Sequence, residues 1–248
     1  MTALLEVERL SKWFGGLQAV ADVSFTIQEG GIVGLIGPNG AGKSTLFDLL
    51  SGVQRSTSGR VRFRGHDVTG GGAHWSAHRI AALGMSRTFQ KVRVFPGMTV
   101  LDNAMVGAFL HTIHPAEAQA RAEEALEMVD LPGAMRHRST RSLTLVDRKR
   151  LEMARALCTR PSLLLLDEVL SGLNPQEITV ALDLIRRLSQ SGLTLIVVEH
   201  LLRVIMELSQ RVLVMDYGEL IADGSPQEVR RNPKVIKAYI GGTEESHA

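Results

Sequence analysis

The sequence has a single cysteine, Cys158, among 248 residues, and it has no apolar segment long enough to cross a membrane. One cysteine excludes an internal disulfide framework and any metal site built from several cysteines, and it fits a reducing compartment. The longest apolar runs, such as LTLIVV at residues 193–198, are far shorter than the roughly 18 residues of a membrane span. The first residues include acids and no basic stretch before an apolar segment, so we expect no export signal. These absences predict a soluble intracellular protein.

An excess of charge of one sign is also missing. The 28 lysines and arginines nearly balance the 26 aspartates and glutamates, which leaves a net charge of +2. Near-zero net charge argues against a protein that holds DNA or RNA mainly by bulk electrostatics. Residues 136–150 are locally basic, but no aromatic side chains interleave them, which favours a solvated face over a nucleic-acid site. We therefore expect no nucleic-acid partner.

Short apolar segments alternate with helical patterns along the chain. The apolar content of 44% is that of an ordinary globular protein. Alternating or continuous apolar runs predict strands at residues 5–10, 23–27, 31–36, 60–65, 162–168 and 193–200. Helical patterns follow Gly42, cover residues 178–189, and dominate from about residue 100 to 160.

Strands that alternate with helices predict an α/β protein with a parallel sheet covered on both faces. We expect one domain, whose core is formed by residues of about 1–90 and 160–248. The intervening residues, about 91–160, are expected to form a mostly helical subdomain.

A glycine-rich phosphate-binding pattern, GPNGAGKST, occupies residues 37–45. It fits G-x-x-x-x-G-K-[ST], and a predicted strand precedes it while a predicted helix follows it. Glycines let successive backbone N–H groups turn toward an anion, and the helix N-terminus adds positive potential. We expect Lys43 to reach the β and γ phosphates and the Ser44 hydroxyl to bind Mg²⁺; the alternative is a glycine-rich turn with an accidental lysine. The predicted nucleotide-binding residues of this loop are Gly37, Pro38, Asn39, Gly40, Ala41, Gly42, Lys43, Ser44 and Thr45.

Polar residues end two other apolar strands. Asp167 and Glu168 follow LLLL, and His200 ends LTLIVVEH. Ligands of open α/β sheets bind at the carboxyl ends of the strands, where Asp167 can help to hold Mg²⁺ and Glu168 can orient and polarise a water. His200 can hydrogen-bond a γ-phosphate or the attacking water. The alternatives are a carboxylate pair that simply faces solvent and a histidine with a structural role.

The order of these motifs resembles that of the nucleotide-binding subunit of ABC transporters. The phosphate loop is followed by Gln90 in SRTFQ, then RLEMARAL, LLLLDE with SGLNP, and VVEH, over nearly the whole chain. The resemblance implies a P-loop NTPase core with a mostly parallel sheet, an N-terminal antiparallel β subdomain and a helical insert. It implies that ATP and Mg²⁺ bind, that Gln90 contacts Mg²⁺ and the membrane partner, and that Glu168 is the catalytic base. His200 would sense the γ-phosphate.

An aromatic side chain early in the chain stacks on adenine in the same family. Phe14, which precedes a glycine pair, is the best match, and Trp13 is the alternative. Either aromatic could instead pack in the core or lie at a surface edge.

Two longer segments narrow the resemblance. RTFQKVRVFPGMTVLDN at residues 87–103 and ADGSPQEVRRNPKVIKAYIGG at residues 222–242 look like the ATPase subunits of branched-chain amino acid importers. That subfamily works at the cytoplasmic face of the inner membrane, with two membrane permeases, a second ATPase subunit and a periplasmic solute-binding protein. The resemblance thus implies ATP-driven import. Alternatives are a soluble ABC-type ATPase outside transport and an ATP-binding scaffold with little turnover.

One segment departs from the family pattern. Where an LSGGQ-type motif is expected, residues 143–147 read LTLVD. Thr144 keeps a hydroxyl that can contact nucleotide, as can the backbone of Val146, but both glycines and the glutamine are missing. Thr144 and Asp147 also have the spacing of a helix capping box, and the two roles can coexist. We expect the ATP site that receives this segment to be the weaker one of a dimer.

Other features carry less functional information. Asn174 stands where the family usually has aspartate. His74 and His78 are four residues apart without a third ligand, which favours surface histidines over a metal pair. Cys158 follows ARAL in a predicted helix, so we expect a packed rather than a reactive thiol. Three glycines at residues 70–72 predict a flexible loop.

Overall fold

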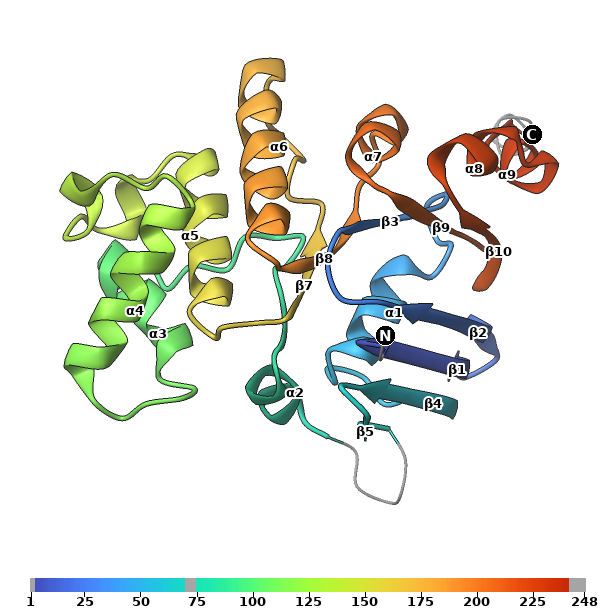
Figure 1. The fold of residues 1–248 in the computed structure, drawn as a ribbon, viewed down its shortest axis with the longest axis horizontal. Helices are drawn as coiled ribbons and strands as arrows, with labels where there is room; N and C mark the ends of the chain where they lie inside the picture. The colour runs from blue at the N-terminus through green and yellow to red at the C-terminus, as the bar shows by residue number, and fades with distance from the viewer. Residues whose placement is uncertain (1–2, 70–74, 241–248) are drawn as a thin grey trace. The chain divides into compact units, whose positions relative to one another are not determined.

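A computed structural model describes residues 3–69 and 75–240 (Figure 1). The chain forms two compact units. The first unit comprises Met1–Ala77 and Thr194–Ala248, and the second comprises His78–Leu193. The predicted glycine loop at residues 70–72 and His74 lie outside the described residues.

The N-terminal part of the first unit is an antiparallel sheet. Its strand order is β2-β1-β4-β5, and Leu5 of β1 lies opposite Ile27 of β2 and Phe63 of β4. All three side chains are buried, because residues directly opposite one another on neighbouring strands face the same side of the sheet. The strands are β1 (Leu5–Phe14), β2 (Leu17–Ile27), β4 (Ser58–Phe63) and β5 (His66–Asp67).

The other strands of the first unit explain its continuous apolar runs. β3 (Ile32–Ile36) pairs in parallel with β8 (Thr194–Val198) and with β9 (Arg211–Asp216). Every residue of β3 and β8 is buried, as expected for parallel strands covered on both faces. β10 (Glu219–Gly224) is antiparallel to β9.

The sequence analysis missed the β9–β10 hairpin. Tyr217 and Gly218 between the strands have φ values of 44° and 83°. Two consecutive positive φ values define a two-residue turn that matches the twist of a hairpin. The apolar run of β9 followed by Tyr217 and Gly218 could have predicted this hairpin.

Helices of the first unit pack on these strands. α7 packs on β3, and α8 packs on β9 and β10. The helices are α1 (Lys43–Leu50), α7 (Leu202–Leu208), α8 (Pro226–Arg231) and α9 (Pro233–Ile240).

The second unit combines a short parallel strand pair with helices. β6 (Met85–Arg87) pairs in parallel with β7 (Leu163–Asp167). α3, α4 and α5 pack against one another, and a Cβ at Gly107 of α3 would overlap the Arg155 carbonyl of α5, so the two helices require glycine at this crossing. The helices are α2 (Ala77–Leu83), which starts at the division between the units, α3 (Val100–Ala108), α4 (Pro115–Met128), α5 (Leu145–Leu157) and α6 (Pro175–Gln190).

The predicted fold class is confirmed. A strand is present at each predicted position, and helices follow Gly42 and occupy the predicted helical segments. The compact units divide at residues 77/78 and 193/194, whereas the sequence analysis placed a core and a helical subdomain with boundaries near 90 and 160. That subdivision stays a prediction. Within the described residues, no helix combines the length and apolar character needed to cross a membrane.

Candidate functional site

The phosphate loop connects β3 to α1 within the first unit. Gly42, at the N-cap of α1, has a φ of 97°, and a Cβ there would overlap the Ala19 carbonyl oxygen. A Cβ at Gly37 would likewise overlap the Met215 carbonyl oxygen, so both positions require glycine. No side chain caps the N-terminus of α1. The N–H groups of its first turn are therefore suited to bind an anion such as phosphate.

Lys43 places a buried ammonium group on this loop. Its Nζ donates hydrogen bonds to the carbonyl oxygens of Gly37 at 2.7 Å and Pro38 at 2.8 Å. A buried cation beside a helix N-terminus that no side chain caps is suited to bind a phosphate group. Ser44, the next residue of α1, is exposed, and Thr45, which follows it, is half-buried.

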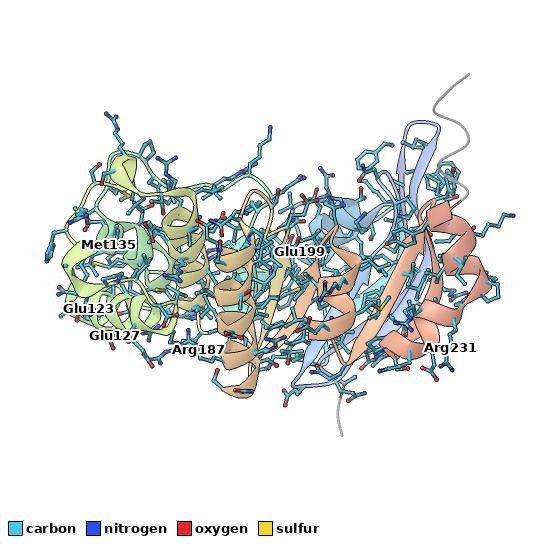
Figure 2. The ribbon with its side chains drawn as sticks, turned by 90° about the horizontal axis from the view of Figure 1, so that it is seen from above. Glu123, Glu127, Met135, Arg187, Glu199 and Arg231 are labelled. Atoms are coloured by element: carbon cyan, nitrogen blue, oxygen red, sulfur yellow. The ribbon has the colours of Figure 1, made fainter. Side chains whose placement is uncertain are left out.

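The other candidates of the first unit lie at strand ends. Phe14 is the last residue of β1 and Trp13 precedes it, and both are 45% exposed. Core packing is therefore wrong for both aromatics, but exposure does not distinguish them as partners of adenine. The Lys12 ammonium lies 4.9 Å from the centre of the Phe14 ring. His200 is exposed shortly after β8 ends, and the preceding Glu199, labelled in Figure 2, is buried.

The second unit brings Gln90 and two carboxylates together at the end of β7. Asp167 and Glu168 are both buried. Arg87 lies 3.2 Å from the Asp167 carboxylate, and Gln90 Nε2 donates to Glu168 Oε2 at 2.9 Å. Glu168 has a φ of 49°, a strained conformation for a residue with a side chain and one that is common at functional sites. The sequence analysis missed Arg87, whose strand β6 lies beside β7.

Thr144 caps α5, as predicted, but the second bond of the capping box is different. The Thr144 hydroxyl accepts from the Asp147 N–H at 3.2 Å, which confirms the cap. We expected the Asp147 carboxylate to accept from the Thr144 backbone N–H; instead it accepts from the Thr144 hydroxyl at 2.7 Å. Leu145 is exposed and Val146 is half-buried. The first turn of α5 therefore carries a carboxylate and two apolar side chains.

Asn174 has a capping role. It is the N-cap of α6 and forms a complete capping box with Glu177.

The locally basic segment is partly neutralised by acids of α4. Arg136 lies 2.8 Å from Glu127 and 3.5 Å from Glu123, both labelled in Figure 2. Arg150 donates to the carbonyl oxygen of Asp130 at 3.1 Å. These contacts hold basic side chains against acidic and carbonyl groups of the same unit.

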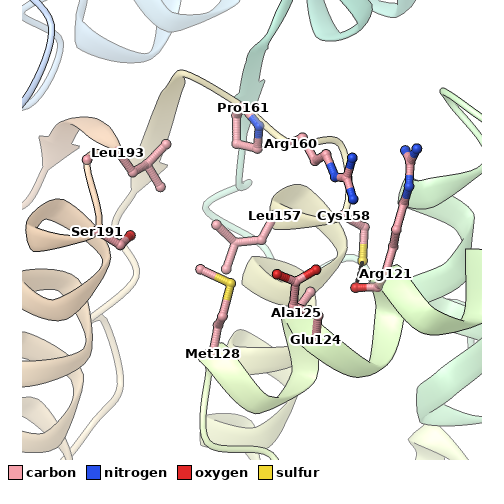
Figure 3. Close-up of a pocket in the computed structure, with 11 residues that line it drawn as sticks. Arg121, Glu124, Ala125, Met128, Leu157, Cys158, Arg160, Pro161, Ser191 and Leu193 are labelled. Atoms are coloured by element: carbon pink, nitrogen blue, oxygen red, sulfur yellow. Dashed lines mark hydrogen bonds between the residues drawn. The ribbon is translucent and has the colours of Figure 1, made fainter.

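A cavity of about 310 Å³ in the second unit lies beside Cys158 (Figure 3). None of the predicted nucleotide or metal residues lines it. Cys158 is buried, and burial raises the pKa of its thiol to about 12, which keeps the thiol protonated and confirms a packed side chain. His78 is exposed, whereas His74 lies outside the described residues. Among the residues that the structure describes, no three His, Cys, Asp or Glu side chains form a metal-binding group.

A phosphate loop between a buried strand and an uncapped helix, in an α/β fold, defines a P-loop nucleotide-binding protein. The ABC transporter family matches residues 20–171. A second family, described as branched-chain amino acid ATP-binding cassette transporter, matches residues 219–245. The chain therefore belongs to the ABC transporter family of ATP-hydrolysing cassettes.

Curated relatives extend the match to nearly the whole chain. BraF of Pseudomonas aeruginosa, a high-affinity branched-chain amino acid transport ATP-binding protein, is 39% identical over 254 residues, 96% of this chain and 98% of BraF. LivG of Escherichia coli K12, with the same description, is 38% identical over 253 residues, with the same coverage. A crystal structure of an ABC transporter ATP-binding cassette in its ADP conformation has a TM-score of 0.85 and 29% identity, and covers 97% of this chain and 100% of that cassette. These matches confirm the family and the fold inferred from the sequence.

Proposed function

We propose that this chain is the ATP-binding and hydrolysing subunit of an ABC importer for branched-chain amino acids or a related small solute. The observation that carries the proposal is the similarity to BraF and LivG over 96% of the chain. The family match at residues 219–245 supports the same cargo class. This similarity favours the importer over a non-transport ATPase or a scaffold with little turnover.

Uptake by intact cells tests the proposal, because the cell supplies whatever partner subunits the chain requires. Deletion of the coding sequence should abolish high-affinity uptake of labelled leucine, isoleucine or valine, and the wild-type chain should restore it. Unchanged uptake of all three amino acids after deletion would contradict the cargo class.

The proposed chemistry assigns a role to each candidate residue. ATP phosphates bind the N–H groups of the phosphate loop and Lys43, and Phe14 or Trp13 stacks on adenine. Mg²⁺, when bound, neutralises charge on the phosphate oxygens. Glu168 accepts a proton from the attacking water, and His200 hydrogen-bonds the γ-phosphate. The residues that would hold Mg²⁺ are Ser44, Gln90 and Asp167.

The proposed partners are two membrane permeases, a second ABC ATPase subunit and, indirectly, a periplasmic solute-binding protein. The chain would then act at the cytoplasmic face of the inner membrane. The predicted helical subdomain, with Gln90, would receive a short permease helix. Large apolar side chains that are exposed in this part of the second unit support that role. They are Phe95, Met98, Val106, Phe109 and Ile113.

Gln90→Ala should uncouple transport from hydrolysis. The substitution removes the side chain that links the ATP site to the permease in the resembled family, but it leaves the phosphate loop intact. In vesicles that contain the complete complex, we expect leucine uptake per ATP hydrolysed to fall, while hydrolysis continues at a lower rate. An unchanged ratio would count against this role of Gln90.

The two ATP sites of the proposed dimer should be unequal. In ABC dimers, the segment that corresponds to residues 143–147 approaches the nucleotide of the opposite subunit. Leu145 and Val146 add bulk where glycine would let the backbone approach a phosphate. The Asp147 carboxylate also competes for the positive helix end, and two unit charges about 7 Å apart repel by roughly 2 kcal/mol at an effective dielectric of 20. The hydrogen bond from the Thr144 hydroxyl disperses part of that charge.

Restoring the family pattern tests this inequality. The triple variant Leu145→Gly, Val146→Gly and Asp147→Gln removes the bulk and the carboxylate. With the site on this chain's phosphate loop blocked by Glu168→Gln, we expect residual hydrolysis to rise about tenfold, below the roughly 30-fold that 2 kcal/mol allows. Unchanged or lower hydrolysis would mean that LTLVD is a working variant matched to its partner.

A further inference from the structure

Helix α5 carries three charged side chains on its inner face. Lys149, Glu152 and Arg155 are spaced by three residues, so they lie along one side of the helix. Lys149 is 9% and Glu152 3% exposed, and the Arg155 side chain is 15% exposed. Buried charges are costly unless each finds partners of opposite charge or strong hydrogen bonds. Their partners therefore indicate what the helix holds in place.

Glu152 holds the loop that carries Gln90. Its Oε1 accepts a hydrogen bond from the Arg93 backbone N–H at 3.3 Å. The main chain of Phe89 is also near enough to lower the pKa of the Glu152 carboxylate. Arg93 lies three residues after Gln90, so the Glu152 carboxylate ties the loop to α5 close to Gln90. Burial raises the pKa of Glu152, while these main-chain groups and the charges of Arg155 and Lys149 oppose the rise.

Arg155 and α3 fix the chain that continues from this loop. The Arg155 guanidinium lies 5.2 Å from the centre of the Phe95 ring. Buried Asn103 of α3 accepts from the Phe95 N–H at 2.8 Å and donates to the Phe95 carbonyl oxygen at 3.1 Å. The loop is thus anchored at Arg93 and Phe95, shortly after Gln90.

Lys149 contacts Glu168, the residue to which Gln90 is hydrogen-bonded. Its Nζ donates to the main-chain carbonyl oxygen of Glu168 at 3.1 Å in a buried environment. Glu168 has a strained backbone, and strained residues persist only where their surroundings fix them. Gln90 Nε2 donates to the Glu168 carboxylate. Because a carboxylate only accepts, the amide nitrogen must face Glu168, which leaves Gln90 Oε1 as an oxygen ligand for a cation.

We infer that Lys149 and Glu152 are positioning residues for ATP hydrolysis. From adjacent turns of α5, they fix the positions of Glu168 and of the loop that carries Gln90. Lys149 fixes the main chain of Glu168, and Glu152 fixes the loop from which Gln90 orients the Glu168 carboxylate. The link to hydrolysis rests on the proposed role of Glu168. The link between α5 and the loop rests on the contacts alone.

Hydrogen exchange of the full-length chain tests the contacts directly. Glu152→Leu should speed exchange of the Arg93 amide at least tenfold, because the amide loses its acceptor. Glu152→Gln, which keeps the shape and one acceptor oxygen but not the charge, should give a smaller increase. Glu127→Leu, which removes an acid of a surface ion pair on α4, is the matched control and should leave exchange of the Arg93 amide unchanged. Equal protection of the Arg93 amide in wild type and Glu152→Gln, or faster exchange spread evenly over the chain, would overturn the inference.

A double-mutant cycle on ATP turnover separates positioning from a merely structural role. We expect Gln90→Ala and Glu152→Gln each to lower kcat while ATP affinity changes by less than threefold. If Glu152 acts through Gln90, the double variant should be no slower than the slower single variant, within about twofold. Losses that multiply would overturn this link. Lys149→Met should lower kcat in the same way, whereas Lys149→Arg, which keeps a cationic donor, should restore part of it.

The exchange and turnover experiments distinguish failure of the positioning role from failure of the proposed catalytic base. If Glu168→Gln leaves turnover unchanged, the proposed catalytic base is wrong, and the exchange data still decide whether Glu152 holds the loop. If Glu168→Gln lowers turnover, but the kcat losses of Gln90→Ala and Glu152→Gln multiply in the double variant, the assignment of the catalytic base is supported and the positioning role is wrong.

Discussion

Glu168→Gln should lower ATP turnover by about 10²–10⁴-fold while ATP still binds. The amide keeps the shape of the carboxylate, and it can still accept the hydrogen bond that Gln90 donates at 2.9 Å. It has no basicity, however, so it cannot take a proton from the attacking water. Steady-state hydrolysis gives turnover, and titration with a fluorescent ATP analogue gives affinity.

The complex used for this measurement needs its second ATP site disabled, because that site would otherwise supply background hydrolysis. Glu127→Gln, at the exposed end of an ion pair with Arg136, is the matched control and should turn over at the wild-type rate. Near-normal turnover of Glu168→Gln in such a complex would show that another group acts as the base.

Lys43→Ala should weaken ATP binding by roughly 30- to 5,000-fold, because truncating one partner of a buried charge pair costs about 2–5 kcal/mol. The Lys43 ammonium is buried against the Gly37 and Pro38 carbonyl oxygens, so no solvent ion replaces it easily. The same fluorescent analogue measures the loss.

Lys234→Ala provides the control for charge, because Lys234 is an exposed lysine of α9. Its affinity should match the wild type. A circular dichroism melt of Lys43→Ala checks that the fold persists. Affinity of folded Lys43→Ala within threefold of wild type would contradict the assignment of the phosphate loop.

Local sequence features were sufficient to predict the parts of the fold that short-range physics dictates. β3 and β8 are buried along their whole length, so their apolar runs identify them whatever their neighbours are. Gly37 and Gly42 lie where a side chain would overlap the backbone, so the spacing of the glycines encodes the loop directly. The Thr144 cap was likewise predictable, because a cap bonds only to its own first turn.

Contacts between distant residues could not be predicted in this way. The hydrogen bond between Lys149 and the Glu168 carbonyl depends on how α5 packs near the end of β7, which no local pattern encodes. A buried lysine and glutamate on the inner face of α5 were also unexpected, since charged residues usually face solvent. Even the Thr144 cap was only half predicted: with two acceptor oxygens available, the Asp147 carboxylate bonds the hydroxyl rather than the backbone N–H.

The central claim is that this chain hydrolyses ATP to drive uptake of a branched-chain amino acid. The most direct measurement is the ATPase rate of the complete complex in vesicles, with and without the solute-binding protein loaded with leucine. The account predicts that the loaded binding protein raises the rate, that Gln90→Ala weakens this response, and that isoleucine or valine can replace leucine. If the complex hydrolyses ATP but its ATPase rate does not change when the binding protein is loaded with any of the three amino acids, the account is contradicted.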